Sequence, residues 1–126
     1  MMQRIFGLAV IVSLMIIFSA DAYAQKLGGY KEIPKTDPAA KAAAEFAVSA
    51  EAEKTGKSVE FVAIHKAERQ TVAGANYRLC IKVTTQGEKN EADVTHFVKV
   101  VVYQNLKQEY KLASWETSDC GEEDDD

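Results

Sequence analysis

Two cysteines and two histidines are the residues of this chain best suited to nucleophilic or metal chemistry: Cys80, Cys120, His65 and His96. A catalytic Cys–His pair requires a hydrogen bond between the two side chains and a third group that orients the base. No sequence signature of such a pair is present, and the G-x-S-x-G, H-E-x-x-H and phosphate-loop motifs are also missing. The four residues lack the spacing of a zinc site. We therefore expect neither an enzyme nor a metal or cofactor site.

The most informative segment predicts a short hairpin and consists of Gln70, Thr71, Val72, Ala73 and Gly74. It has one apolar residue near the tip of a small turn, and the turn ends in glycine. Residues 76–79 then continue as a strand. Taken alone, the segment is typical of an ordinary hairpin tip. Two further segments accompany it: Leu-Gly-Gly-Tyr at 27–30, and Ala-Glu-Phe-Ala-Val at 44–48.

These three segments resemble the motifs of the cystatins, protein inhibitors of papain-like cysteine proteases. The glycine-bearing N-terminal trunk, the helix signature best known in plant cystatins and the Q-x-V-x-G hairpin occur in the family's order, and the resemblance extends over residues 27–120. It implies an α+β, cystatin-like fold with one long helix packed across a curved antiparallel sheet of four to five strands. It also implies a protein that blocks another protein's active site.

Local patterns independently predict the same order of elements. Asp37 and Pro38 are typical of a helix start, residues 39–54 are rich in Ala and Glu, and Gly56 is suited to end the helix. We expect the inner face of this helix, with Phe46 as its main anchor, to consist of Ala39, Ala43, Phe46, Ala47 and Ala50. Alternating patterns predict strands at 30–33, 59–69, 75–85, 94–103 and 110–116, with polar turns at 86–90 and 104–109.

A meander of these strands places the hairpins at 70–74 and 104–109 at one end of the sheet, with the trunk alongside. The resemblance implies that this end plugs the protease cleft. Its contact residues would be Leu27, Gly28, Gly29, Gln70, Thr71, Val72, Ala73, Gly74, Asn105 and Leu106. Leu27 would fill the apolar pocket that reads the second residue before a scissile bond. The two glycines would let the backbone pass the enzyme's thiolate and turn away without being cut.

Two features depart from the family pattern. Many cystatins carry Pro-Trp in the second hairpin, where this chain has Tyr-Gln-Asn-Leu-Lys at 103–107. We expect Leu106 to substitute in part, and Trp115 to pack in or on the sheet. The stretch 54–58 lacks the Asn with which some cystatins block legumain, so no legumain site is expected.

A second class of function stays open, since fold alone does not settle function. The alternative to inhibition is an exported cystatin-fold binding or adhesion module without inhibitory activity. A net charge of −4 without a basic stripe argues against nucleic-acid binding. We expect a monomer, with domain swapping as the alternative state.

The two ends of the chain predict export and a charged tail. Residues 1–24 carry Arg4, an apolar run at 5–18 and a small-residue cleavage pattern near Ala22 or Ala24. An uncleaved membrane anchor is the alternative. We expect a secreted or periplasmic domain at 25–120 that does not engage the membrane after cleavage, followed by an acidic, disordered tail at 121–126.

The pairing of the two cysteines is open at this point. An exported chain can keep a disulfide. A bridge between Cys80 and Cys120 would close a long loop and stabilise the folded state by about 4 kcal/mol. Cys120 lies about where secreted animal cystatins have their last bridged cysteine, whereas Cys80 departs from that pattern. The alternatives are two free thiols, or a bridge from Cys120 to another molecule.

Overall fold

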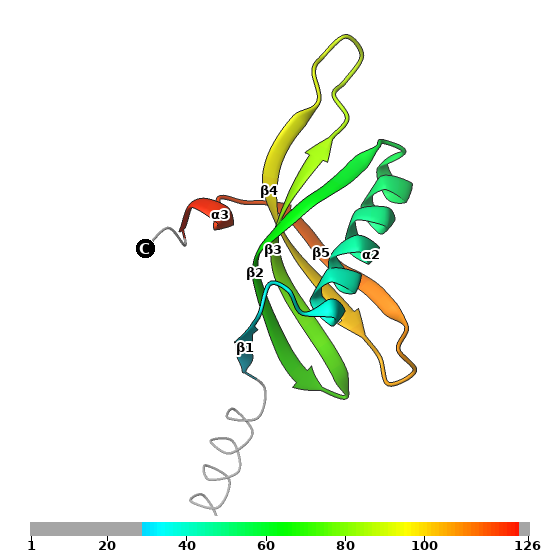
Figure 1. Ribbon diagram of the computed structural model, residues 1–126. Coiled ribbons are helices and arrows are strands. Elements are labelled where there is room, and N and C mark those ends of the chain that lie inside the picture. The colour runs from blue at the N-terminus through cyan, green and yellow to red at the C-terminus, as the bar shows by residue number, and fades with distance from the viewer. Residues whose placement is uncertain (1–28, 124–126) are drawn as a thin grey trace, which may run out of the picture.

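The computed structural model describes residues 29–123 as one helix packed on a five-stranded antiparallel sheet. The strands neighbour one another in chain order, and the elements are β1 (Tyr30–Ile33), α2 (Pro38–Thr55), β2 (Val59–Val72), β3 (Gly74–Thr85), β4 (Val94–Gln104), β5 (Tyr110–Thr117) and α3 (Cys120–Glu123). Figure 1 shows the sheet curving around α2, with α3 on the opposite face. The predicted α+β fold is confirmed. The expected signal peptide at 1–24, and Leu27 and Gly28, lie outside the described residues. No helix in the described part of the chain is long and apolar enough to cross a membrane.

The helix begins and ends where its terminal residues predict. The Asp37 carboxylate accepts a hydrogen bond from the backbone N–H of Ala39 at 3.1 Å, and Pro38 occupies the first turn, where it forfeits no helical hydrogen bond. Gly56 caps the other end in the left-handed region at φ 75°, and its N–H donates to the Ala52 carbonyl. Both ends are therefore set by local chemistry.

The inner face of α2 differs from the predicted stripe. The buried residues are Ala40, Ala43, Ala44, Ala47 and Val48, so only two of the five expected positions lie at the centre. The prediction that Phe46 is the main anchor is wrong: its ring is partly buried at the flank and packs on Tyr110 at 5.3 Å between centroids. A phenyl ring at the centre would hold the helix away from the sheet, whereas methyl groups allow close approach. The helix is accordingly rotated to present alanines.

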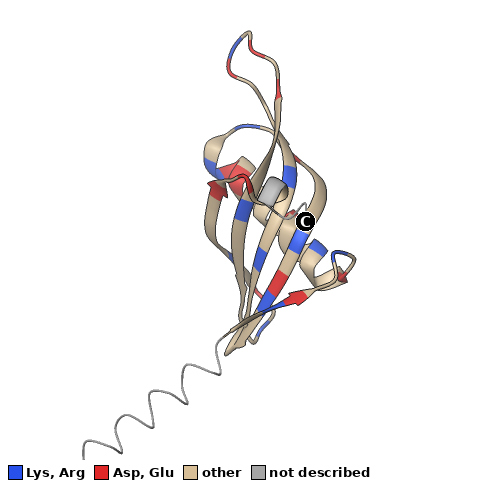
Figure 2. Cartoon of the chain, turned by 90° about the vertical axis from the view of Figure 1, so that its left-hand side faces the viewer, with Lys and Arg blue, Asp and Glu red and all other residues tan. Residues whose placement is uncertain are grey.

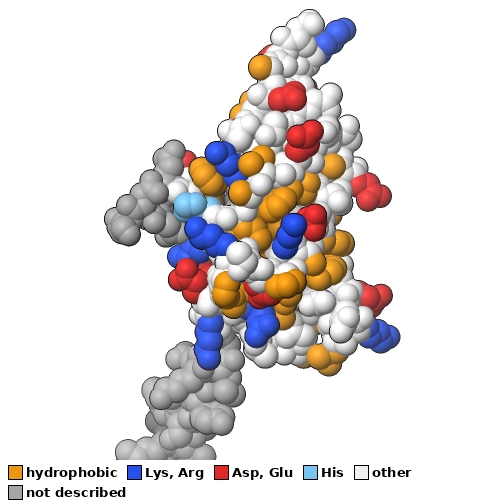
Figure 3. Space-filling view, viewed as in Figure 1, with side chains coloured by type: hydrophobic (Ala, Val, Ile, Leu, Met, Phe, Trp, Pro, Cys, Tyr) orange, Lys and Arg blue, Asp and Glu red, His pale blue; other side chains and the backbone are white. Residues whose placement is uncertain are grey.

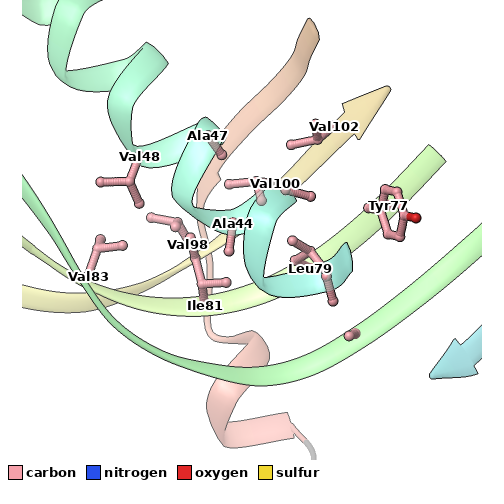
Figure 4. Close-up of a cluster of buried hydrophobic side chains, with 13 residues drawn as sticks. Ala44, Ala47, Val48, Tyr77, Leu79, Ile81, Val83, Val98, Val100 and Val102 are labelled. Atoms are coloured by element: carbon pink, nitrogen blue, oxygen red, sulfur yellow. The ribbon is translucent and has the colours of Figure 1, made fainter. Parts of the chain in front are cut away.

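The sheet supplies the larger half of the core. Side chains of alternate residues on β3 and β4 point toward α2 and are almost fully buried: Leu79, Ile81, Val83, Val98, Val100 and Val102. Figure 4 shows them facing Ala44, Ala47 and Val48 of the helix. Period-two alternation puts the polar partners of these residues on the outer face of the sheet, the face away from α2. Trp115 on β5 packs against this core, as predicted.

Irregular pairing bends the sheet. Register shifts interrupt the β2–β3 ladder between Phe61 and Ala63 and between Ile64 and Lys66, and another interrupts β4–β5 at Val101 and Val102. Extra residues of this kind bend a strand and increase its twist. They allow the long strands to wrap around one helix without losing the pairing at their ends.

A disulfide joins Cys80 on β3 to Cys120 at the start of α3, with 6.0 Å between the two Cα atoms. This is one of the alternatives left open by the sequence. The bridge spans a separation of 40 residues. Closing a loop of that length in the unfolded chain is worth about 4 kcal/mol in the chain-entropy description. It fixes the start of α3 to the outer face of the sheet.

An ion pair lies on the same outer face. Arg78 donates from Nε and Nη2 to the two carboxylate oxygens of Glu68, at 2.9 and 3.0 Å, across the β2–β3 ladder. The Arg78 guanidinium also lies over the Tyr30 ring, 4.0 Å from its centroid, which ties β1 to the sheet. The hydrogen bond from Arg78 holds the pKa of Glu68 below its ordinary value of 4.5, against the opposing effect of partial burial.

We expect Glu68→Gln to lower the free energy of unfolding at neutral pH, by about 1 kcal/mol or less because the pair is partly exposed. The folded pKa of Glu68 lies below the unfolded one, so the contribution is complete above 4.5 and is lost as the pH falls further. Denaturant unfolding at a series of pH values should show the difference between wild type and variant shrinking in acid. Glu60→Gln, at an exposed position on the same strand, supplies the baseline. A difference that does not change with pH would contradict this assignment.

Candidate functional site

Two hairpin tips meet at one end of the sheet. Ala73 connects β2 to β3, and residues 105–109 connect β4 to β5. The pairing of Ala75 with Gln104 places the two connections side by side. Figure 1 shows both at the lower end of the molecule, with the β3–β4 connection at the opposite end. We call this end, formed by residues 70–74 and 104–109, the two-hairpin edge. The meander predicted it.

The backbones of the two hairpins touch at Gly74. This residue has φ 101°, a conformation that side chains rarely adopt. A Cβ atom built on Gly74 would lie 2.2 Å from the carbonyl oxygen of Gln104 and 3.1 Å from Cα of Asn105. Any side chain would therefore push the hairpins apart. Glycine is needed here for both the turn and the close approach.

Side-chain hydrogen bonds brace the first hairpin. The Tyr103 hydroxyl, from the second hairpin's strand, donates to the Ala73 carbonyl at the tip. The Asn76 amide donates to Oε1 of Gln70 at 2.9 Å, across the paired positions of β2 and β3. The sequence predicted neither of these two hydrogen bonds. Asn76 could have been found, because it stands as far after Ala73 as Gln70 stands before it.

The second hairpin is organised by Asn105. Its side-chain oxygen accepts hydrogen bonds from the backbone N–H groups of Lys107 and Glu109, both at 2.9 Å. Its own N–H donates to the Glu109 carbonyl, and Gln108 completes the loop in the left-handed region at φ 66°. This Asx-type network leaves Leu106 at the tip, 80% exposed.

The tips present apolar side chains to solvent. In the part of the chain that the structure describes, four large hydrophobic residues are exposed: Val62, Val72, Val94 and Leu106. Val72 and Leu106 both belong to the two-hairpin edge, and Val72 is 41% exposed. Figure 3 shows hydrophobic side chains among charged ones at this lower end. Their shared position is the pattern expected of a contact surface.

The N-terminal trunk reaches the same end. Tyr30 begins β1 and pairs with Gln70 on β2, so Gly29 lies directly beside the first hairpin. Gly29 is exposed, and a Cβ atom built on it would meet no other atom within 4 Å. Nothing in the described chain therefore requires glycine at this position. Leu27 and Gly28 precede it outside the described residues.

The residues suited to nucleophilic chemistry are occupied elsewhere. Cys80 is bridged and so has no thiol. The His65 ring packs edge-on against Phe97 at 5.6 Å between centroids, and Nε2 of His96 is hydrogen-bonded to the Thr85 hydroxyl at 3.0 Å. Within residues 29–123, no group of three or more His, Cys, Asp or Glu side chains is arranged to hold a metal ion. The two-hairpin edge itself carries no catalytic constellation.

Comparison with known proteins agrees with this geometry. Residues 32–118 match a family model described as SQAPI, aspartic acid proteinase inhibitor. The salivary cystatin-L2 of Ixodes scapularis is 33% identical, and the match covers 83% of this chain and 94% of the tick protein. The crystal structure of a salivary cystatin from the soft tick Ornithodoros moubata has the same fold, with a TM-score of 0.57 and 23% identity over 72% of this chain and 97% of that one.

The chain belongs to the cystatin family of protease inhibitors. The family is non-enzymatic, and its targets are proteases. The family assignment that the three sequence motifs predicted is confirmed.

We expect Gly74→Ala to destabilise the fold by about 2 kcal/mol or more, because it adds a steric clash to an unfavourable backbone conformation. Gly56→Ala is the matched control: Gly56 also has positive φ but faces open space, so only about 1 kcal/mol of backbone strain is expected. Denaturant unfolding measures both. NMR amide shifts at Gln104 and Asn105 should change for Gly74→Ala alone. Equal costs with unchanged shifts would show that the hairpins do not touch.

Proposed function

We propose that this protein is a reversible, competitive, tight-binding inhibitor of papain-like cysteine proteases that occludes the active-site cleft. The observation that carries the proposal is the contact between the two hairpins, with apolar tips at Val72 and Leu106 and a glycine trunk beside them. The residues that the resemblance assigned to protease contact would all lie along this one edge.

The physical basis is preorganisation. Hydrogen bonds made by Asn105, Tyr103 and Asn76 hold the tips before a partner arrives, so little conformational entropy is lost on binding. A modest interface can then bind tightly. Val72 and Leu106 would supply apolar contact on the cleft floor. Leu106 would stand where many cystatins have tryptophan, the kind of anchor whose loss commonly costs about 2 kcal/mol.

The trunk would act through its glycines. The described chain gives no reason for glycine at Gly29, which supports a requirement set by the partner. With Gly28 it would let the backbone pass the enzyme's thiolate and turn away, while Leu27 fills the apolar pocket alongside. Because no scissile bond is presented, the complex would dissociate intact.

Export would bring the inhibitor to its targets. The leader pattern at 1–24 supports secretion, and so does the relative from Ixodes scapularis, whose name describes a salivary cystatin. The inhibitory domain would then comprise residues 25–120 of a monomer. A bridge between Cys80 and Cys120 suits that oxidising destination.

A second candidate function is inhibition of aspartic proteases. The family model that matches residues 32–118 is described by that activity. It would use the same edge, because the fold offers preformed loops and no chemistry specific to one protease class. The sequence signature of trunk and hairpin favours the cysteine-protease assignment. A binding module without inhibitory activity is the third outcome that an assay can reveal.

Titration of the purified mature protein against papain and against pepsin separates these functions. We expect papain activity to fall linearly to zero near one equivalent, with full recovery on dilution or competition by substrate, and pepsin to remain active. Loss of pepsin activity alone would establish the second candidate. If both enzymes, and a wider panel of each class, stay fully active, the protein is a binding module without inhibitory activity.

Val72→Asp should raise the inhibition constant for papain by about 30-fold or more, because a charge without a partner would enter a dry contact at a cost of about 2 kcal/mol. Val94→Asp is the matched control: Val94 is also an exposed strand valine, but it lies at the opposite end of the sheet, paired with Thr85. Inhibition assays should show no change for the control. Equal effects at both positions would remove the first hairpin from the contact.

Gly28→Trp should weaken inhibition by about tenfold or more, since an indole would obstruct the passage of the trunk through the cleft. Its melting temperature should match that of the wild type. Lys89→Trp, in the connection at the far end, tests whether an added tryptophan alone interferes. Undiminished inhibition by Gly28→Trp would exclude the trunk from the mechanism.

A further inference from the structure

A group of lysines surrounds the disulfide on the outer face of the sheet. Lys66 on β2 and Lys99 on β4 are the cross-strand partners of Cys80, one on each side. Lys82 follows Cys80 by two residues on β3 and so shares its face. Directly paired residues of an antiparallel sheet lie about 5 Å apart between Cβ atoms. We call these three lysines the bridge cluster.

The bridge cluster adjoins a small hollow. Its volume is about 70 Å³, and its lining includes the charged side chains of Lys66, Arg78, Lys99 and Glu68 together with both bridged cysteines. Glu68 is held by two hydrogen bonds from Arg78. Glu116 on β5 lies opposite Lys99. Three cationic side chains and one carboxylate thus line the hollow, in a protein whose net charge is −4.

The disulfide holds the residues around Cys120 next to the bridge cluster. Cys120 is bonded to the centre of the bridge cluster, and Gly121 is buried against Phe97: a Cβ atom there would lie 2.4 Å from the ring. The Nζ atom of Lys82 is 5.8 Å from the centroid of the same ring. Figure 2 shows α3 lying across a face whose strands carry several Lys and Arg segments. The residues that follow Gly121 are Glu-Glu-Asp-Asp-Asp, five consecutive acids at 122–126.

We propose that the acidic segment 122–126 docks on the bridge cluster, as an intramolecular polyanion that neutralises the outer face. Glu122, the first of these acids, follows the bridged Cys120 by only two residues, so the segment begins beside the centre of the cluster. Single exposed ion pairs are weak. Here the tether replaces a bimolecular encounter by a high effective concentration, and several pairs form together.

The covalent link through Cys120 also favours the acidic segment over an external polyanion as the group bound to the bridge cluster. An external polyanion would have to displace a segment that is covalently held at the site, and would approach a protein of like overall charge. The face concerned lies opposite α2 and away from the two-hairpin edge, so the proposal does not depend on protease inhibition. In this proposal the segment is part of the folded surface, in contrast to the disordered tail that composition alone predicted.

NMR of the mature protein tests the proposal at about 20 mM and about 500 mM NaCl, since salt screens exposed charges. At low salt we expect the amides of residues 122–126 to have heteronuclear NOE values near those of the sheet and shifts away from random coil. At high salt the NOE values should drop to those of a disordered tail, and the shifts should move to random-coil values. Removing residues 122–126 should in turn shift the side-chain resonances of Lys66, Lys82 and Lys99. Tail-like amides at low salt would overturn the proposal.

Substitution supplies the matched control. Lys66→Gln, Lys82→Gln and Lys99→Gln together should release the segment at low salt. The same changes at Lys35, Lys89 and Lys107, which are exposed in connections between other elements, should leave it ordered. Equal behaviour of the two triple variants would contradict docking on the cluster. Amide shifts that depend on protein concentration would assign the segment to a neighbouring copy. Retention of the intact protein on heparin would mean an external polyanion occupies the face. Each of these results would overturn the intramolecular proposal.

Discussion

The close approach of Gly74 to the Gln104 carbonyl is the constraint on which the site depends. A hairpin tip by itself is a mobile, easily varied surface. Here two tips that are 30 residues apart in the chain are fixed against each other by backbone contact and by the Tyr103–Ala73 hydrogen bond. Their separation cannot drift, so their combined shape is a property of the folded domain. Shape of that kind is what an inhibitor without chemistry must offer a rigid cleft.

The rest of the fold preserves this contact. The ladder between β3 and β4 runs without a register shift from Ala75 to Thr85, so the position of one tip determines the position of the other. The irregularities that bend the sheet lie in β2 and at the β4–β5 pairing. Curvature is thus obtained beside the ladder that joins the two hairpins. The alanine face of α2 allows the concave side to close tightly on the helix without large side chains that would flatten the sheet.

The order and type of the elements could be predicted from the sequence, because the residues that begin and end them act locally. Asp37, Pro38 and Gly56 define the helix through their own backbone chemistry, and alternation of valines and polar residues defines the strands. Periodicity could not predict which face of α2 is buried. Alanines occur on two adjacent faces of the helix, so the face that packs on the sheet is determined only by the closer fit between them. The partners of Gln70 and Ala73 were missed for a related reason. Asn76 and Tyr103 acquire their roles only when register and curvature bring them to the tip.

The second hairpin shows how a family geometry survives the loss of its usual residues. Tryptophan contributes area and rigidity together, because its large side chain has few rotatable bonds. In this chain the two properties are divided: Leu106 would supply the apolar surface, and Asn105 holds the loop by accepting hydrogen bonds from the backbone N–H groups of Lys107 and Glu109. The edge therefore keeps its preorganisation while presenting a smaller contact. Nothing in the contact between the hairpins is specific to a thiolate. In the proposed mechanism, the choice between protease classes would therefore depend on the tip side chains and on the trunk, where the described chain itself does not require glycine.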